Sequence, residues 1–407
     1  MNRPKGFPLA PGPDTGWNLF DGDVAFPVAV LLESALTHNG AMMRQYCEQH
    51  RVSLAPHGKT TMAPALFRRQ IADGAWAITA ATTWQAKTML ETGLDRVLIA
   101  NQVVVPAEIE WLAEATSDGF EVYCYIDSVA GVEIMNDTLA TVGRDVTLPV
   151  LLEVGVAGGR TGVRSLDAGV DVARAAATAS HLALTGTAGF EGIITGSDHL
   201  AAAELVRGFL DRIVEMTHAV AKGGWFEPSP EVIITAGGSA YFDHAVERFS
   251  NVRVDFPSRI VLRSGCYLTH DDGSYDRSSP MGQHPRTESG VRLQPALEVW
   301  GVVLSRPEPT RAVVGMGKRD VSGDGLLPLV KRVRRRGRDD VEAVEPMRVV
   351  ALNDQHAYLD LASDDPLRVG DLVGVGISHP CTTFDKWRAM ALVDEDYNVI
   401  EMVETLF

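Results

Sequence analysis

Short apolar runs alternate with amphipathic or alanine-rich segments between about residue 50 and residue 270. The runs are rich in valine and isoleucine and are bounded by glycine and polar residues, a pattern that predicts β-strands. The intervening segments have helical character, and the longest of them covers residues 200–221. Eight strands are predicted in this region, beginning at Arg51, Trp76, Arg96, Glu121, Leu148, Leu184, Glu231 and Arg259.

Eight strands that are each followed by a helical segment are typical of a parallel (β/α)8 barrel, an α/β fold. A doubly wound open sheet contains the same alternating elements, and periodicity alone does not separate the two folds. The region is about 220 residues long, close to the ~250 residues of such barrels. We therefore predict an N-terminal arm over residues 1–25 and a barrel over residues 26–285.

The pattern changes after about residue 290. Here the apolar runs alternate or are valine-rich, as in "ALEVWGVVLSR" and "MRVVALNDQHAYLDL", and glycine, proline and aspartate interrupt them without any long helical pattern. A series of short strands of this kind predicts an antiparallel β domain. We assign this second domain to residues 286–407.

The composition is that of an ordinary globular protein, with 45% hydrophobic and 22% charged residues among 407. The formal net charge of −16 argues against binding to nucleic acid, which needs a basic face. One basic run, residues 331–338, is followed at once by the acidic stretch 339–345. We interpret the pair as an exposed loop whose charges compensate each other, with contact to a phosphate or polyanion as the alternative.

The four cysteines are scattered without paired spacing, which is typical of a protein from a reducing cytosol. The N-terminal residues lack the apolar core of a secretion signal, and the apolar stretch 26–32 is far too short to span a bilayer. We expect a soluble, cytoplasmic protein whose partners include neither membrane nor nucleic acid.

Candidate chemistry begins with Lys59, in "LAPHGKTTMAP" at residues 54–64. Catalytic side chains of a (β/α)8 barrel come from the carboxyl ends of its strands, and the first predicted strand ends at His57, Gly58 and Lys59. A lysine at a strand end is commonly a solvated charge or a salt-bridge partner. A partly buried lysine amine is instead suited to covalent chemistry.

Glycine-rich ends of the last two barrel strands favour the covalent role. The seventh strand ends in "TAGGSA" and the eighth in "RSGCY", at the two places where this fold commonly binds phosphate. Glycine lets backbone N–H groups approach an anion, and Ser239 adds a hydroxyl donor. A phosphate site opposite a strand-end lysine suggests pyridoxal 5′-phosphate, because its aldehyde condenses with a lysine amine.

Two charged residues are candidates for contact with such a cofactor. Arg160 lies in "EVGVAGGRTGVR", where the glycines would let its guanidinium turn inward toward a ring or a carboxylate. An arginine on an exposed loop is the alternative. Glu191, in "GFEG", is a carboxylate among apolar residues and is either a structural acid or the partner of a cofactor heteroatom.

His379 and Cys381, in "GISHPCTTFDKW", form a second candidate site. On an extended segment, side chains two residues apart face the same way. Imidazole and thiolate together suit a borderline-soft ion such as zinc, with water or substrate in the remaining positions. The alternative is a buried cysteine beside a hydrogen-bonded histidine.

These motifs together resemble the fold-type III pyridoxal-phosphate enzymes related to D-serine dehydratase and D-threonine aldolase. The resemblance rests on "PHGKT", "GGRTGV", "GFEG", "TAGGS", "SGCY" and "SHPC", between about residue 54 and residue 387. It implies an alanine racemase-like barrel with a C-terminal β domain, assembled as a homodimer. Lys59 would be the Schiff-base lysine with His57 beside it, and His379 and Cys381 would hold a divalent metal, zinc or manganese. Arg160 and Glu191 would lie by the cofactor, and its phosphate would be surrounded by Gly237, Gly238, Ser239, Gly265, Cys266 and Tyr267.

Three residues depart from the usual pattern of that family. A histidine is common where Thr61 stands, and a valine or a similar residue is common where Gly58 stands. Glutamate is usual at Asp354, although His356 is retained nearby.

The resemblance implies a lyase that acts on D-amino acids with a hydroxyl on Cβ. A D-serine dehydratase removes the α-proton, with Lys59 itself as base, and expels the hydroxyl to give a 2-keto acid and ammonia. The histidine–cysteine pair resembles dehydratase members, so this activity is the first expectation. A D-threonine aldolase, which breaks Cα–Cβ to give glycine and an aldehyde, is the alternative. An amino-acid racemase using Tyr358, or a non-enzymatic carrier of the cofactor, are further alternatives.

Overall fold

The computed structural model describes residues 4–8, 14–22, 24–226 and 231–407, and these form two compact units. The first, the barrel unit, contains Arg44–Lys59 and Phe67–Gly265. The second, the β unit, contains Thr60–Leu66, Cys266–Phe407 and the described residues up to Met43. Residues 1–3, 9–13 and 23 of the predicted N-terminal arm lie outside the described residues.

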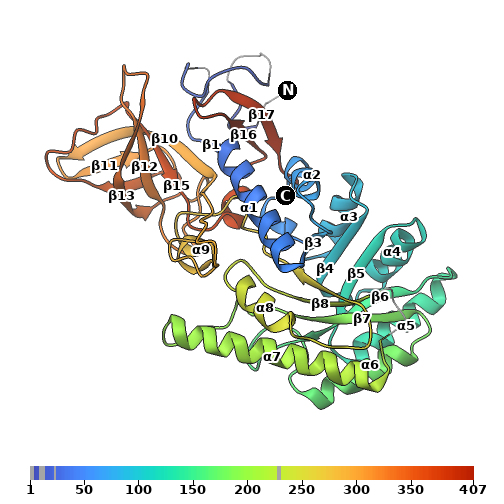
Figure 1. The fold of residues 1–407 in the computed structure, drawn as a ribbon. Coiled ribbons are helices and arrows are strands. Elements are labelled where there is room, and N and C mark those ends of the chain that lie inside the picture. The colour runs from blue at the N-terminus through green and yellow to red at the C-terminus, as the bar shows by residue number, and fades with distance from the viewer. Residues whose placement is uncertain (1–3, 9–13, 23, 227–230) are drawn as a thin grey trace. The chain divides into compact units, whose positions relative to one another are not determined.

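The barrel unit has one sheet of eight parallel strands (Figure 1), and each coincides with a strand predicted from the sequence. The sheet closes on itself because the end of β2 pairs with β3: Trp76 N donates to Leu54 O at 2.7 Å, and Thr79 N donates to Pro56 O at 2.9 Å. The predicted (β/α)8 barrel is therefore confirmed. Its strands are β2 (Ser53–Leu54), β3 (Ile78–Ala80), β4 (Arg96–Gln102), β5 (Glu121–Ile126), β6 (Leu148–Val154), β7 (Leu182–Gly189), β8 (Val232–Ala236) and β9 (Ser258–Leu262).

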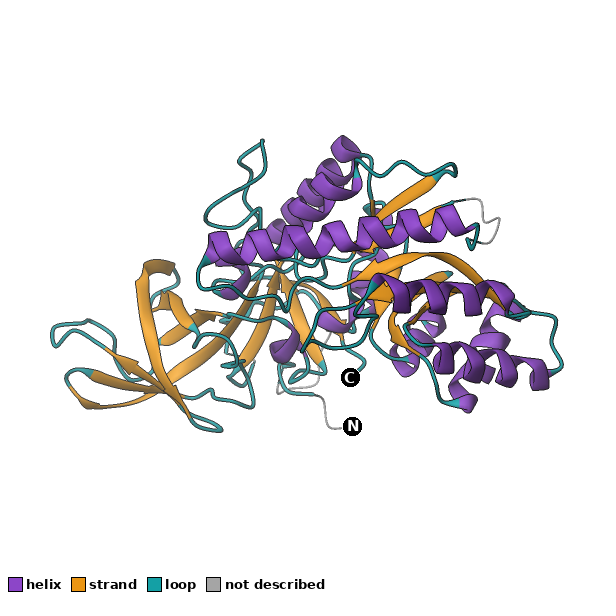
Figure 2. Cartoon of the chain, turned by 90° about the horizontal axis from the view of Figure 1, so that it is seen from below, coloured by secondary structure: helices purple, strands orange, loops and turns teal. Residues whose placement is uncertain are grey.

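Helices follow the strands, and several begin at residues whose side chains cap the helix. The side chains of Ser128, Ser165 and Asp198 accept hydrogen bonds from the first turns of three successive helices. Figure 2 shows these helices on the outside of the curled sheet. They are α2 (Pro64–Ala72), α3 (Thr83–Glu91), α4 (Pro106–Ser117), α5 (Val129–Val142), α6 (Leu166–Thr178), α7 (His199–Gly223) and α8 (Phe242–Phe249).

The barrel interior is filled by alternate side chains of the strands. One buried cluster takes a residue from each strand or its immediate neighbours, combining small alanines with the larger Tyr125 and branched residues. A filled interior is the usual condition of this fold, so ligands have to bind at the ends of the strands. The cluster consists of Ala55, Ala77, Leu98, Tyr125, Leu151, Ala188, Ile233 and Val261.

The β unit is built on a nine-stranded sheet in the order β11-β14-β13-β12-β15-β10-β1-β16-β17. All pairings are antiparallel except that of β1 with β16. The predicted β domain is thus confirmed, and strands account for most of its regular structure (Figure 2). The strands are β1 (Val28–Leu32), β10 (Leu297–Glu308), β11 (Arg311–Val314), β12 (Leu329–Arg334), β13 (Val341–Leu352), β14 (Ala357–Asp360), β15 (Leu372–Gly376), β16 (Ala389–Val393) and β17 (Val399–Glu404).

Three segments assigned to the barrel from the sequence, residues 26–43, 60–66 and 266–285, belong to the β unit. For the first segment the reason is backbone pairing, because β1 hydrogen-bonds to β10 on one side and to β16 on the other. It leads into α1 (Glu33–His50). An apolar run buried on both sides reads the same way in a barrel strand and in the middle of a mixed sheet.

The basic run at residues 331–338 differs from the predicted loop, since it is a strand as far as Arg334. Val330 and Val333 are buried and anchor β12, and their cationic neighbours form ion pairs. Arg332 contacts Glu298 at 2.7 Å, a residue far away in the sequence. The predicted compensation is present beyond the strand, where Arg338 pairs with Asp340 at 2.6 Å and with Glu342 at 2.8 Å.

Among the described residues, no helix combines the length and the hydrophobicity that crossing a membrane would require.

Candidate active site

His57 and Lys59 lie where β2 ends, as predicted. Lys59 is in the single turn η1 (Gly58–Thr60) and is half-buried, and His57 forms a bridge with Thr79 of β3. Burial, together with the positive charges of Lys59, Arg263 and Arg160, holds the pKa of His57 well below 6.5. His57 is therefore neutral at physiological pH and stands in an electropositive environment.

Gly58 is closely packed against side chains of the barrel unit. A Cβ at this position would lie 2.6 Å from Ile78 Cγ2, 2.6 Å from Met89 Cε and 2.9 Å from Phe67 Cε1. These neighbours belong to the barrel unit and fill the space that a larger residue would occupy. The absence of a side chain at Gly58 therefore lets the turn that contains Lys59 pack closely against these neighbours.

Arg263 follows β9 and was not predicted as a site residue. It is 5% exposed and donates to Thr235 Oγ1 and to Gly189 O, both at 2.6 Å. Arg160 follows β6 on an exposed loop, with its guanidinium 4.5 Å from the centre of the Phe190 ring. Both charges act on His57, so two guanidinium groups and the Lys59 ammonium surround the carboxyl end of β2. Such a cluster attracts an anionic ligand.

Glu191 is fully buried and binds the glycine loop that follows β8. Its carboxylate accepts hydrogen bonds from Gly238 N at 2.6 Å and from Gly237 N at 3.2 Å. Gly237 has φ +83°, a backbone conformation that favours glycine. Of the two roles considered for Glu191, the structure supports the structural acid, which fixes the loop in which half-buried Ser239 also lies.

Gly265 lies against the backbone of His57. An added Cβ would be 2.6 Å from His57 O, 2.8 Å from His57 Cβ and 3.0 Å from His57 N. The close approach lets the loop after β9 pass directly beside His57, in the same strand end as Lys59. The following residues, Cys266 and Tyr267, are buried and belong to the β unit.

We predict that Gly265→Ala destabilises the enzyme by about 1–3 kcal/mol, because backbone atoms of His57 have to move to accommodate the methyl group. Urea-induced unfolding measures the change. Gly208→Ala is the matched control, since a Cβ at exposed Gly208 meets no atom within 4 Å. Equal stability of the two variants would contradict the prediction.

Three buried polar atoms near the carboxyl ends of the strands have no hydrogen-bond partner among the described residues. They are His57 Nδ1, just after β2, Gln102 Oε1, at the end of β4, and the hydroxyl of Tyr125, in β5. Gln102 also donates to the buried Glu153 at 2.7 Å. Buried polar groups are rarely left without partners, so these atoms indicate a polar ligand. Together with the cation cluster and Lys59, they fit pyridoxal phosphate, which has a polar ring and a phosphate.

The metal-ligand candidates lie in a sulfur-rich cluster of the β unit. The sulfurs of Cys266 and Cys381 are 3.9 Å apart, and the Thr60 hydroxyl is 3.3 Å from Cys381 Sγ and 3.8 Å from Cys266 Sγ. The thiol of Cys266 and the imidazole of His379 both lower the pKa of Cys381 by hydrogen bonding, which favours a thiolate. Thr60 is joined directly to Lys59 in the chain.

His379 and Cys381 do not lie on an extended segment, so the alternation argument for them was wrong. Cys381 is the first residue of the short helix α10 (Cys381–Phe384), which begins directly after Pro380. Their side chains nonetheless meet: hydrogen bonding to Cys381 is the main cause that raises the pKa of His379 to about 9. The two side chains are brought together by the turn that leads into α10, and not by the alternation of side chains along a strand.

Asp324 orients His379, with its Oδ2 2.8 Å from His379 Nδ1. Burial acts to raise the pKa of Asp324, but hydrogen bonds from Ser322 and His379 outweigh it and lower the pKa. With Nδ1 engaged by the carboxylate, Nε2 is the ring nitrogen left for an ion. A carboxylate on the far nitrogen is the usual support of a metal-binding histidine.

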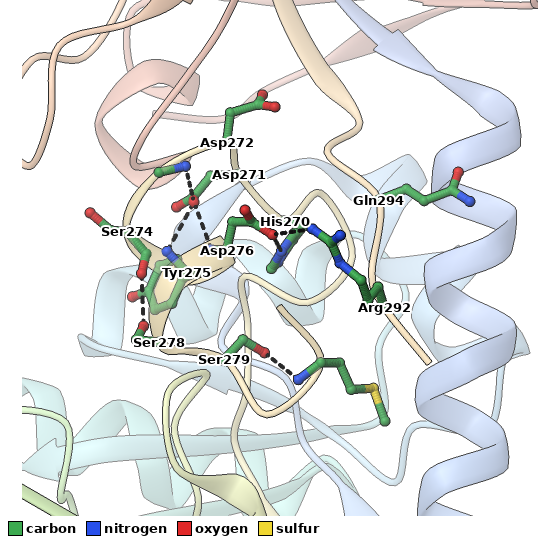
Figure 3. Close-up of polar contacts among 12 residues, drawn as sticks. His270, Asp271, Asp272, Ser274, Tyr275, Asp276, Ser278, Ser279, Arg292 and Gln294 are labelled. Carbon is green, nitrogen blue, oxygen red and sulfur yellow. Dashed lines mark hydrogen bonds and ion pairs between the residues drawn. The ribbon is translucent and has the colours of Figure 1, made fainter. Parts of the chain in front are cut away.

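The short helix α9 (Ser274–Ser278) presents Tyr275 to the same cluster. Asp271 Oδ1 accepts hydrogen bonds from the backbone N–H groups of Gly273, Tyr275 and Asp276 at 2.9, 2.9 and 3.2 Å (Figure 3). Burial raises the pKa of Asp271 to about 6. The ring of Tyr275, held by these bonds, meets the His379 ring edge-on at a centroid distance of 6.3 Å.

Among the residues described, no three His, Cys, Asp or Glu side chains are arranged as a complete metal site. His379 and Cys381 supply two donors, which fits an ion whose other positions are taken by water or substrate. We predict that Asp324→Asn weakens zinc binding about 10- to 100-fold by loosening His379. Chelator competition measures this affinity, with Asp385→Asn, an exposed residue beyond α10, as the control. Unchanged affinity in Asp324→Asn would contradict the prediction.

Comparisons with known proteins agree with this geometry. The model of the putative serine dehydratase domain matches residues 296–393. The 3-hydroxy-D-aspartate aldolase of Paracoccus denitrificans (strain Pd 1222) is 26% identical, covering 89% of this chain and 86% of that protein. The crystal structure of D-threonine aldolase from Filomicrobium marinum has a TM-score of 0.79 and 25% identity, covering 97% of this chain and 98% of that one.

The chain is similar to fold-type III pyridoxal-phosphate enzymes related to D-serine dehydratase and D-threonine aldolase. D-threo-3-hydroxyaspartate dehydratase from Delftia sp. HT23 shares the fold, with a TM-score of 0.73 and 19% identity over 94% of this chain and 98% of that one. The aldolase and dehydratase relatives indicate a pyridoxal-phosphate-dependent lyase.

Sequence reasoning missed three residues that the structure adds to the site. Arg263 directly precedes the "SGCY" motif, but its sequence position indicates only a charge at a strand end. Its burial in the structure is what identifies it as a candidate site residue. Asp324 lies 55 residues before His379 in a loop without a motif. Thr60 was seen only as a neighbour of Lys59, whereas its hydroxyl contacts both cysteines.

Proposed function

We propose that this enzyme is a metal-assisted lyase of D-3-hydroxy amino acids. The observation that carries the proposal is the side-chain pair of His379 and Cys381, oriented by Asp324 and in contact with Thr60, which directly follows Lys59 in the chain. A racemase or a carrier protein needs a lysine but has no use for a soft metal-ligand pair. A substrate hydroxyl is the group that such an ion would act on.

The barrel residues have distinct tasks in this proposal. The charges around His57 attract the phosphate of the cofactor and the carboxylate of the substrate. Pyridoxal phosphate, when bound, would stabilise the negative charge that develops on the substrate. Lys59 accepts the α-proton in a dehydratase, while neutral His57 offers Nδ1 as a hydrogen-bonding atom beside it. Glu191 keeps the loop after β8 in place.

His379 Nε2 and the Cys381 thiolate would hold the metal ion. The donor pair fits zinc, and manganese is the second candidate. The ion would serve as a Lewis acid toward the substrate hydroxyl. That role is common to both possible reactions, since a dehydratase must expel the hydroxyl and an aldolase must deprotonate it.

We infer that the reaction is a dehydration, as in D-serine dehydratase, because the second donor is a thiolate, as in the dehydratase members that the sequence resembles. The retro-aldol reaction is the second candidate. It is supported by the 3-hydroxy-D-aspartate aldolase and D-threonine aldolase relatives, which cover most of this chain. Cleavage of Cα–Cβ by this chain would give glycine and an aldehyde.

A product assay on enzyme loaded with pyridoxal phosphate and zinc separates the two reactions. D-serine, D-threonine and D-3-hydroxyaspartate are supplied in turn, and ammonia, 2-keto acid, glycine and aldehyde are quantified together. Dehydration gives equal amounts of keto acid and ammonia. Equal amounts of glycine and aldehyde would assign the enzyme to the aldolases, and racemisation without either product pair would refute the lyase proposal.

A further inference from the structure

The sulfurs of Cys266 and Cys381 approach each other more closely than the mechanism requires. They are 3.9 Å apart, and the hydroxyl of Thr60 contacts both of them. Cys266 comes from the loop after β9 and Cys381 from the start of α10, so the pair joins segments separated by 115 residues in the chain. Only Cys381 has been given a task in the proposed reaction.

The two thiols differ in exposure in a way that suits stepwise oxidation. Cys381 is half-buried, whereas Cys266 is 4% exposed. A small oxidant therefore reaches Cys381 first and finds Cys266 behind it. Cysteines that respond reversibly to oxidants usually combine an accessible thiolate with a second thiol close enough to resolve the first product.

We propose that Cys266 and Cys381 form a peroxide-sensitive oxidation site that closes as a disulfide. In the first step the Cys381 sulfur attacks a hydroperoxide and is oxidised to sulfenic acid, the peroxide O–O bond breaks, and water or an alcohol leaves with the Cys381 proton. In the second step the Cys266 sulfur displaces the sulfenic hydroxyl. The S–S bond forms, the S–O bond breaks, and one water leaves with the Cys266 proton.

Closing the disulfide requires only a short movement. The sulfurs have to approach from 3.9 Å to about 2.0 Å, and nothing larger than a proton lies between two atoms at that separation. Both residues lie in loop or helix-end positions of the β unit, outside its strands. A dithiol reductant reverses the reaction by thiol–disulfide exchange.

The disulfide has a consequence that rests on the proposed role of Cys381 as a metal ligand. A sulfur in a disulfide has no thiolate charge, so His379 would remain as the single donor of the pair. Zinc would then be released, and the lyase would be inactive until a reductant restores the thiolate. Bound zinc would in turn protect Cys381 from oxidation.

The test uses full-length enzyme with bound pyridoxal phosphate, freed of zinc by a chelator and treated with hydrogen peroxide. Intact mass spectrometry is expected to show the loss of two hydrogen atoms, peptide mapping to place the bond between Cys266 and Cys381, and dithiothreitol to restore the original mass. In Cys266→Ser the same treatment adds oxygen to Cys381 instead, and dithiothreitol does not fully reverse it. Cys47→Ser, a buried thiol of the barrel unit, is expected to behave like the unaltered enzyme.

An oxygen adduct that persists on Cys381 in the unaltered enzyme, to the same final extent as in Cys266→Ser and without a disulfide, would overturn the proposal. A disulfide that involves Cys47 or Cys124 would overturn it as well. Zinc binding by the oxidised enzyme is measured separately, by adding zinc back after the peroxide has been removed. A loss of zinc binding supports the consequence drawn for the metal. Full zinc binding by an enzyme with the mapped disulfide would refute the ligand role of Cys381 while leaving the oxidation site established.

Discussion

Lys59→Ala is expected to lower kcat for every D-3-hydroxy amino acid by at least about 10³-fold, the scale on which loss of a covalent catalytic group acts. The lysine is held half-buried in the turn η1, directly after β2, where the charges of Arg160 and Arg263 also act. Lys59 is the one lysine in "PHGKT", so no neighbouring amine of this turn can replace it. The measurement is product formation under saturating cofactor, compared with Lys87→Ala, an exposed lysine of α3.

The same variant provides a readout that does not depend on activity. Borohydride reduction is expected to attach the cofactor covalently to Lys59 in the unaltered enzyme, and peptide mapping locates the attachment. Lys59→Ala should carry no such label although it keeps Arg160 and Arg263. Labelling of a different lysine, or turnover that survives in Lys59→Ala, would show that another residue holds the cofactor.

Removal of the metal is the second large effect that we expect. His379→Ala, or treatment with EDTA, should lower kcat about 10²- to 10⁴-fold, because Lewis-acid stabilisation of the substrate oxygen is worth several kcal/mol. Cofactor binding should remain, since Lys59 and the arginines Arg160 and Arg263 belong to the barrel unit. His218→Ala, an exposed histidine of α7, serves as the control.

Readdition of zinc separates loss of the metal from loss of its ligand. It should restore activity to the EDTA-treated unaltered enzyme and to EDTA-treated His218→Ala, but not to His379→Ala. Full activity of His379→Ala in the presence of EDTA would mean that the donor pair has no part in the reaction. In that case the racemase, with Tyr358 as its second acid or base, would become the leading hypothesis.

The barrel was predictable because its determinants are local. Each strand of the barrel is a short run of apolar residues followed by a segment of helical character, and these signals lie within a few residues of each other. The positions of His57, Lys59, Gly237 and Gly265 followed from strand ends in the same way. Topology alone brings those ends together.

The features that sequence did not predict depend on partners far away in the chain. β1 was grouped with the barrel because its apolar run carries no sign of its pairing with β10 and β16. Arg332 was placed in a loop because its partner, Glu298, is distant in the sequence. Asp324 was invisible for the same reason, since only the folded chain brings it to His379.

The role of Glu191 shows a different limit of prediction from sequence. Its sequence surroundings indicated burial but allowed two roles, and only the hydrogen bonds from Gly237 and Gly238 distinguish them. The sequence prediction that the side chains of His379 and Cys381 lie together was based on an extended backbone. The backbone here is not extended, because a helix begins directly after Pro380. Side-chain direction depends on the backbone conformation, which a two-residue spacing does not fix.

The most direct test of the central claim compares enantiomers. Enzyme loaded with pyridoxal phosphate and zinc is incubated with the D- and L-forms of serine, threonine and 3-hydroxyaspartate, and all carbonyl products are quantified by one chromatographic assay. The account predicts carbonyl product from at least one D-3-hydroxy amino acid, none above background from its L-form, and loss of the product in Lys59→Ala. Equal turnover of both enantiomers, or none of either by enzyme with bound cofactor and metal, would contradict it.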